Sequence, residues 1–289
     1  MNALNWNCDL TRSVEEVRRR EQGLTDKPDR GRGTVTLPEM RRGQVGLCVA
    51  TQIAHCVEQS NPGLSAWNTP EAAWAHSQGQ LAWYRAMEEA AEMVQVSDLE
   101  SLDEHVRRWA QSGEEDPPVG FILSLEGADS ILTLPYLERA YEYGLRALGP
   151  AHFGEGRYAA GTGREEGLTA AGRELVKEMD RLGIILDVTH LTDRGFWEAL
   201  DLYQGPVWAS HSNCRALVPH QRQLDDEQIL ALLERDAVIG TVLDAWMPGC
   251  WSQDGSGTRV RPARADSRWS SLRITSIISA SWPEAPATA

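Results

Sequence analysis

The chain has 289 residues, of which 42% are hydrophobic and 24% are charged, values that are ordinary for a globular protein and exclude a wholly disordered one. Its formal net charge is −14, which argues against nucleic acid or an anionic membrane surface as a partner. No apolar run approaches the roughly 20 residues of a membrane span, and the polar first 25 residues show no signal peptide. The five cysteines are odd in number and never spaced as CxxC, so we expect reduced thiols in a cytoplasmic protein.

The first third of the chain begins with a charged segment that is predicted to hold a short helix over residues 9–20, with Thr11 or Ser13 near its cap. A short apolar run at 45–50 is typical of a strand buried on both faces. A long helix is predicted over 70–96, with Pro70 in its first turn. A further helix is expected to begin at Asp98 or Ser101 and to end near residue 113.

The rest of the chain alternates short apolar runs with helical patterns up to about residue 243. Further strands are predicted over 119–125, 145–148, 184–190, 207–211 and 237–243, and helices over 134–143, 169–182, 192–202 and 225–235. A glycine-rich loop is predicted over 153–167.

This alternation predicts an α/β fold with a parallel sheet and helices outside it. We count six such strands, and polar residues follow three of them at the carboxyl end, where a (β/α)8 TIM-type barrel builds its active site. The alternative fold is a doubly wound open sheet. Such a sheet typically has a glycine-rich turn directly after its first strand, and no such turn follows Val49.

Glu126, His190 and His211 are the polar residues at these three strand ends. Imidazole nitrogen and carboxylate oxygen together suit Zn²⁺, and two such ions about 3.5–4 Å apart can polarise a carbonyl. The alternative is that both histidines are satisfied structural residues at the barrel mouth and that Glu126 pairs with an arginine.

Two further residues lie in loops just beyond strand ends. His152 follows the strand at 145–148 and could donate a hydrogen bond to a developing oxyanion. Arg222 follows the strand that leads to His211 and could hold a substrate carboxylate through two parallel hydrogen bonds. The alternative without a function is that His152 is a histidine of a surface loop and that Arg222 is a solvated loop arginine.

Four stretches carry a family resemblance: GTVTLP at 33–38, SLEGA at 124–128, LDVTH at 186–190 and SHSNCRA at 210–216. In sequence, order and spacing they resemble the membrane dipeptidase (renal dipeptidase) family of zinc peptidases, and more closely its soluble bacterial branch. The resemblance runs from residue 2 to about residue 250. It implies an amidohydrolase-type (β/α)8 barrel with two zinc ions and a dipeptide substrate. A homodimer is the assembly that we expect.

The resemblance also implies roles for the candidate residues. Glu126 would bridge the two metals, and His190 and His211 would complete the second metal site. His152 would contact the scissile carbonyl or its oxyanion, and Arg222 the carboxylate of the substrate. A metal-bound hydroxide would then attack the dipeptide carbonyl.

The chain departs from the family pattern at both ends. The family opens with a His-x-Asp pair after its first strand, whereas this chain begins with residues that resemble those just after the pair. Nothing after Ala245 matches the strand-end Asp that handles the proton of the attacking water. We therefore expect residues 1–251 to form an incomplete barrel without its first and last strands.

The tail at 252–289 differs in composition, and we expect it to be disordered or to come from a shifted reading frame. With a plausible choice of codons, residues 273–288 read one base out of register resemble the family segment before the missing Asp. The expectation is one bound zinc or none, and impaired hydrolysis. The alternatives are a non-catalytic truncated product or pseudo-enzyme, and another amidohydrolase that acts on a cyclic amide or lactam.

Overall fold

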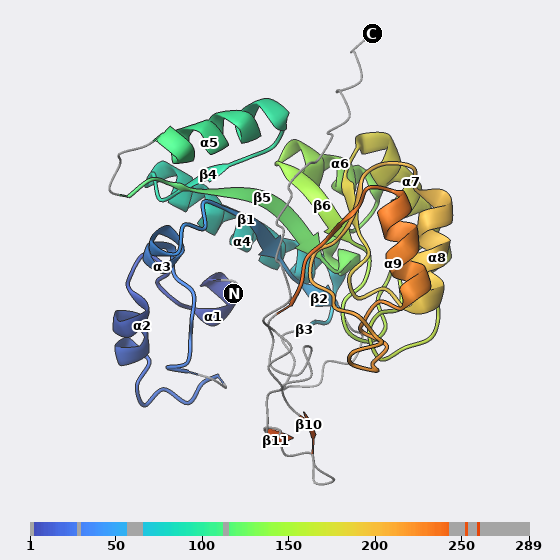
Figure 1. Cartoon of the computed structure of the whole chain (residues 1–289), viewed down its shortest axis with the longest axis horizontal. Coiled ribbons are helices and arrows are strands. Elements are labelled where there is room, and N and C mark those ends of the chain that lie inside the picture. The colour runs from blue at the N-terminus through green and yellow to red at the C-terminus, as the bar shows by residue number, and fades with distance from the viewer. Residues whose placement is uncertain are drawn as a thin grey trace. The chain divides into compact units, whose positions relative to one another are not determined.

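The computed structural model describes residues 3–27, 30–56, 66–111 and 116–242, together with the pairs 252–253 and 259–260 (Figure 1). It divides into two compact units, Met1–Leu148 and Gly149–Ala289, which are taken in turn. Most of the predicted tail at 252–289, and the last residue of the strand predicted over 237–243, lie outside the described residues.

The first unit alternates helices with mostly parallel strands. Its elements are α1 (Ala3–Trp6), α2 (Val14–Arg20), α3 (Leu37–Arg42), β1 (Leu47–Gln52), β2 (His55–Cys56), β3 (Ala66–Trp67), α4 (Pro70–Glu89), β4 (Met93–Gln95), α5 (Leu99–Gln111), β5 (Val119–Glu126), the 3-10 helix η1 (Ala128–Ser130), α6 (Leu134–Glu142) and β6 (Leu145–Gly149).

Strand β5 is the centre of this unit. It pairs in parallel with β1 along six consecutive residues, from Leu47 opposite Gly120 to Gln52 opposite Leu125. It also pairs with β4 at its start and with β6. Residues 119–125 are buried, and the Phe121 ring stacks on a tyrosine of α4 with centroids 5.2 Å apart. A continuously apolar sequence therefore makes a strand covered on both faces, as predicted.

The glycines at the start of this ladder are required by close packing under α5. A Cβ at Gly46 would overlap the ring of Trp109, and a Cβ at Gly120 would overlap the ring of His105. His105 Nε2 lies 2.7 Å from the carbonyl oxygen of Gly46, and Trp109 donates to the carbonyl oxygen of Pro118 at 2.8 Å. The polar tips of both rings thus bond to the strand ends that they cover.

The helix predicted over 70–96 is too long. Helix α4 begins as expected, with Thr69 accepting from the amide of Ala72, but it ends at Glu89. Ala91 takes the left-handed conformation (φ 56°), and β4 follows at Met93. Pairing with β5 outweighs the local helical preference of these residues, because the chain exchanges helical hydrogen bonds for a buried ladder.

The second unit repeats the strand–helix alternation with shorter strands (Figure 1). Its elements are α7 (Ala170–Leu182), β7 (Ile185–Asp187), α8 (Asp193–Leu202), β8 (Val207–Ala209), α9 (Asp226–Glu234), β9 (Val238–Ile239), β10 (Ser252–Gln253) and β11 (Arg259–Val260). Strands β7, β8 and β9 pair in parallel in that order.

The helices of this unit begin and end where their caps predict. Thr169 and Thr192 each accept the amide of the third residue after them, and Asp225 forms a capping box with Gln228. Gly183, in the left-handed conformation at φ 70°, ends α7.

The predicted fold class is confirmed. All six predicted strands form, although β7, β8 and β9 are shorter than predicted, so that His190 and His211 lie just beyond their strands. The sheet strands run in parallel between helices, and the described strands amount to an incomplete barrel-type α/β fold. Among the described residues, no helix combines the length and the apolarity that are needed to cross a membrane.

Candidate metal centre

Two histidines meet beyond the paired ends of β7 and β8. His190 follows the last residue of β7 by three positions, and His211 follows the last residue of β8 by two. Because the strands are parallel, their carboxyl ends lie at the same edge, and the two Nε2 atoms come to 3.3 Å from each other. The structure therefore brings together two of the residues that the strand-end pattern selected.

The backbone at this edge is unusual and is held by one carboxylate. His190 has φ 70°, the left-handed region that non-glycine residues rarely adopt, and it is 5% exposed. Asp187 Oδ1 accepts from the amides of Thr189 at 3.0 Å and of Ser210 at 3.1 Å. This single acceptor joins the two strand ends, which supports a strained conformation of the kind found at functional sites.

Each histidine contacts a hydroxyl through its other ring nitrogen. Thr162 Oγ1 lies 3.0 Å from His190 Nδ1, and Ser210 Oγ lies 2.7 Å from His211 Nδ1. The Nε2 atoms are thereby turned toward each other. Two nitrogen ligands at 2.0–2.1 Å from one tetrahedral ion are about 3.3–3.4 Å apart, so the observed separation fits a shared zinc ion. Two neutral Nε2 lone pairs at this distance repel unless a proton or a cation lies between them.

His152 lies beside this pair. It follows β6, and its ring centroid is 4.6 Å from that of His190. The loop after it folds back so closely that a Cβ at Gly161 would overlap the carbonyl oxygen of His152, which also accepts from the amide of Thr162 at 2.9 Å. Phe153, 51% exposed, sets its ring against His190 with centroids 4.9 Å apart.

Arg222 is buried in the same cluster rather than solvated. It is 5% exposed, and Nη2 donates to the carbonyl oxygen of His211 at 2.7 Å and lies 3.5 Å from His190 Nε2. Nη1 donates to Ser212 Oγ at 3.2 Å. The amide of Arg222 donates to His220 Nδ1 at 3.0 Å, so the side chain of His220 helps to shape the loop.

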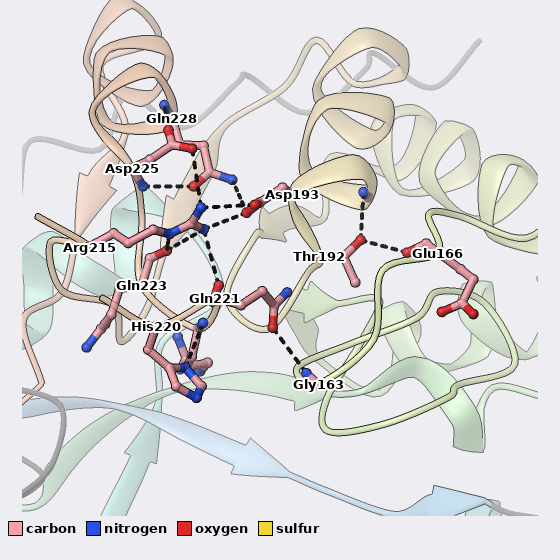
Figure 2. A network of polar contacts seen from close by, with 12 residues as sticks. Gly163, Glu166, Thr192, Asp193, Arg215, His220, Gln221, Gln223, Asp225 and Gln228 are labelled. Carbon is pink, nitrogen blue, oxygen red and sulfur yellow. Dashed lines mark hydrogen bonds and ion pairs between the residues drawn. The ribbon is translucent and has the colours of Figure 1, made fainter. Parts of the chain in front are cut away.

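The loop that carries Arg222 is anchored by Arg215 (Figure 2). Its guanidinium donates to both carboxylate oxygens of Asp193, at 2.6 and 2.9 Å, and to the carbonyl oxygen of Gln223 at 2.8 Å. The bond to Asp193 raises the pKa of Arg215, which keeps the guanidinium charged. Gln221 in turn accepts from the amide of Gly163 at 3.1 Å, which ties this loop to the one that holds Thr162.

Four of the five candidate residues thus gather in the second unit: His152, His190, His211 and Arg222. Glu126 belongs to the first unit, where it is half-buried at the last position of β5, ahead of Gly127 at φ 79°. The positioning residues Thr162, Asp187 and Ser210 were not selected from the sequence. Ser210 could have been, since it directly precedes a candidate ligand, but Thr162 is 28 residues from its histidine and carries no local signal.

Comparison with known proteins identifies one family in both sequence and structure. The family model for membrane dipeptidases (peptidase family M19) matches residues 5–248. An uncharacterised protein encoded in the PQQ-III 3′ region of Acinetobacter calcoaceticus is 32% identical over 143 residues, which is 46% of this chain and 45% of that protein. The chain spans about half or less of the length of the curated relatives it matches.

Two solved structures share the fold. The crystal structure of dipeptidase AC, a metallopeptidase of family M19, superposes with a TM-score of 0.62 at 28% identity, covering 87% of this chain and 73% of the other. A metallopeptidase from Rhodobacter sphaeroides, liganded with a phosphinate mimic of the dipeptide L-Ala-D-Ala, superposes with a TM-score of 0.57 at 28% identity, covering 80% and 70%.

Proposed function

Because this chain belongs to the membrane dipeptidase family, peptidase family M19, we propose that it is a zinc-dependent dipeptidase. Its zinc would be held by Glu126, His190 and His211, which offer a carboxylate oxygen and two imidazole nitrogens, the ligand types that zinc prefers. The observation that carries the proposal is the 3.3 Å separation of the two Nε2 atoms, with both Nδ1 atoms on hydroxyls.

A bound zinc ion supplies Lewis acidity, which polarises a carbonyl and acidifies water. The protein's own residues would do the rest. His152 would donate a hydrogen bond to the peptide carbonyl oxygen as negative charge develops there, a role supported by its ring lying 4.6 Å from that of His190.

Arg222 would receive the substrate carboxylate. The support is its charge and its burial beside the histidine pair, since a guanidinium in such a place binds carboxylates strongly. The dipeptide mimic bound by the Rhodobacter sphaeroides enzyme supports a dipeptide as the substrate class.

Metal binding is the first experiment. The purified chain is stripped with chelator, and zinc affinity and stoichiometry are measured by competition at pH 7.5. We expect one zinc per chain, lost in His190→Ala and His211→Ala and retained in His76→Gln, whose histidine lies in the first unit beside Asn5. Equal zinc binding by His190→Ala and the wild-type chain would remove these residues from the metal site.

Hydrolysis of L-Ala-L-Ala and L-Ala-D-Ala by the zinc-loaded chain is the second experiment, with a cyclic amide as the competing substrate class. Turnover of a dipeptide that falls at least 100-fold in His152→Ala would support the proposed roles. Zinc binding without turnover of either dipeptide would favour a metal-binding protein that is not a peptidase. Turnover of the cyclic amide alone would favour another amidohydrolase.

A further inference from the structure

The polar contacts around the two histidines form one continuous chain. The amide of His211 donates to Thr189 Oγ1 at 3.3 Å, and Thr189 Oγ1 lies 3.3 Å from Ser210 Oγ. Ser210 Oγ contacts His211 Nδ1, and His211 Nε2 contacts His190 Nε2. On the other side of this pair, His190 Nδ1 contacts Thr162 Oγ1. Each link needs one donor and one acceptor, so the protons can be followed along it.

The backbone holds both hydroxyls in place independently of the rings. Thr162 is 5% exposed, donates its amide to the carbonyl oxygen of His152 at 2.9 Å, and accepts the amide of Gly154 at 2.9 Å. Ser210 donates its amide to Asp187. The hydroxyl positions are thus fixed features to which the imidazole rings must conform.

The charge of Arg222 favours one placement of the shared proton between the two rings when no metal is present. Its Nη2 lies 3.5 Å from His190 Nε2, and a cationic donor favours a lone pair at that nitrogen. This contact favours His190 with its proton on Nδ1, where it would donate to Thr162. His211 would then carry its proton on Nε2, donate to His190, and accept from the Ser210 hydroxyl at Nδ1.

We propose that Thr162 and Ser210 are positioning residues with different tasks: Thr162 accepts the Nδ1–H of His190, whose tautomer Arg222 sets in both states, and the Ser210 hydroxyl serves either tautomer of His211, without and with a bound cation. The inference rests on the proposed function in taking that cation to be zinc. With a cation held by both Nε2 atoms, His211 would carry its proton on Nδ1 instead of Nε2, and the pair would keep both of its protons. The Ser210 hydroxyl would then accept a hydrogen bond from His211 Nδ1 and donate its own to Thr189 Oγ1.

The Ser210 hydroxyl is suited to this change because it can donate or accept, whereas an ionised carboxylate only accepts and would hold one tautomer of His211. The second partner of a metal-bound histidine commonly changes metal affinity about 10–100-fold. We expect that loss in Thr162→Val and in Ser210→Ala, and recovery of wild-type affinity in Thr162→Ser. Thr133→Val is the matched control, because Thr133 is exposed and its side chain makes no cap hydrogen bond.

The direct test is ¹⁵N NMR of the imidazole nitrogens in the full chain at fixed pH, with and without one equivalent of zinc. We expect His190 as the Nδ1–H tautomer in both states, and His211 as Nε2–H without zinc and Nδ1–H with it. In Ser210→Ala, the metal-free His211 should become a mixture of tautomers while His190 stays unchanged. A His190 that changes tautomer, or a His211 that does not, would overturn the inference.

The outcomes separate the inference from the proposed function. Wild-type zinc affinity in Thr162→Val and Ser210→Ala, with binding still lost in His190→Ala, would overturn the inference and leave the metal site standing. A chain that binds no zinc would refute the proposed function, and the metal-free spectra would still decide the tautomers. If Thr162→Val fails to fold, the wild-type spectra and Thr162→Ser carry the test.

Discussion

The β1–β5 ladder of the first unit and the β7–β8 ladder of the second are built on different physical principles. The first joins six consecutive residue pairs and lies around a strand that is buried from Val119 to Leu125. The second joins strands of only three residues each, and beyond their ends the chain is held by side chains. Asp187 bonds two amides there, and two hydroxyls contact the imidazole rings.

This difference predicts different responses to substitution. The stabilisation that comes from apolar burial depends on the volume of the buried side chains and not on the orientation of single bonds. Substitutions in the first ladder should therefore alter stability without altering the histidine pair. Hydrogen bonds are directional and costly to leave unmade, so changes at the ends of β7 and β8 should alter stability and site geometry together.

The largest effect is expected for Phe121→Ala, in the middle of β5. Phe121 is fully buried and stacks on Tyr84, so truncation should cost about 3–5 kcal/mol of unfolding free energy, measured by urea titration. Phe121→Leu should cost clearly less, because it retains most of the volume. The ¹⁵N signals of the histidine pair should not move in the folded protein. A change of tautomer would contradict the claim that the first ladder affects stability alone.

Asp187→Ala comes next and should affect both properties. Removal of the carboxylate leaves the amides of Thr189, which is buried, and Ser210, which is half-buried, without their shared acceptor, at a cost of about 2–4 kcal/mol. Zinc affinity should fall as well, because Ser210 then loses its position. Asp187→Asn retains an oxygen acceptor and should lose less than half as much stability. An Asp187→Ala protein with wild-type zinc affinity would contradict the assigned role.

Arg215→Lys sharpens the comparison at the loop. A single ammonium cannot reproduce the fork that bonds Asp193 and the carbonyl oxygen of Gln223 together, so we expect a loss of about 1–2 kcal/mol. Arg194→Lys is the matched control, since Arg194 is largely exposed in its pair with Glu198, and it should change stability by less than about 0.5 kcal/mol. Equal losses in the two variants would show that the network does not anchor the loop.

The smallest effect is expected for the pH dependence of the unfolding free energy that His76, in the first unit, causes. Burial lowers the pKa of His76, so the unfolded chain takes up a proton at a higher pH than the folded one. The unfolding free energy should therefore fall as the pH drops below about 6.5 and through the folded pKa of His76. Urea titrations at pH 7.5 and 5.5 should show a smaller loss in His76→Gln than in the wild-type chain. An equal loss in both would mean that His76 does not contribute.

Local rules let the sequence predict most elements of the fold. Ser13, Thr69 and Asp225 lie at helix starts because their side chains satisfy amides within the same turn. Strand β5 is readable because burial on both faces demands a continuous apolar run. Strand β4 escaped prediction because its three residues continue a helical pattern, and only pairing with β5 decides otherwise.

By itself, the sequence determined the α/β class and the placing of His190 and His211 at strand ends, because parallel strands bring such ends to one edge. The tertiary structure alone decided that Arg222 is buried, since its partners are the carbonyl oxygen of His211 and the hydroxyl of Ser212, at the start of the same connection between β8 and α9, onto which the chain folds back. It alone also decided that Thr162 meets a histidine 28 residues away. The physical reason is that a contact between residues far apart in the sequence depends on the path of the whole backbone between them. The local sequence pattern around either residue does not determine that path.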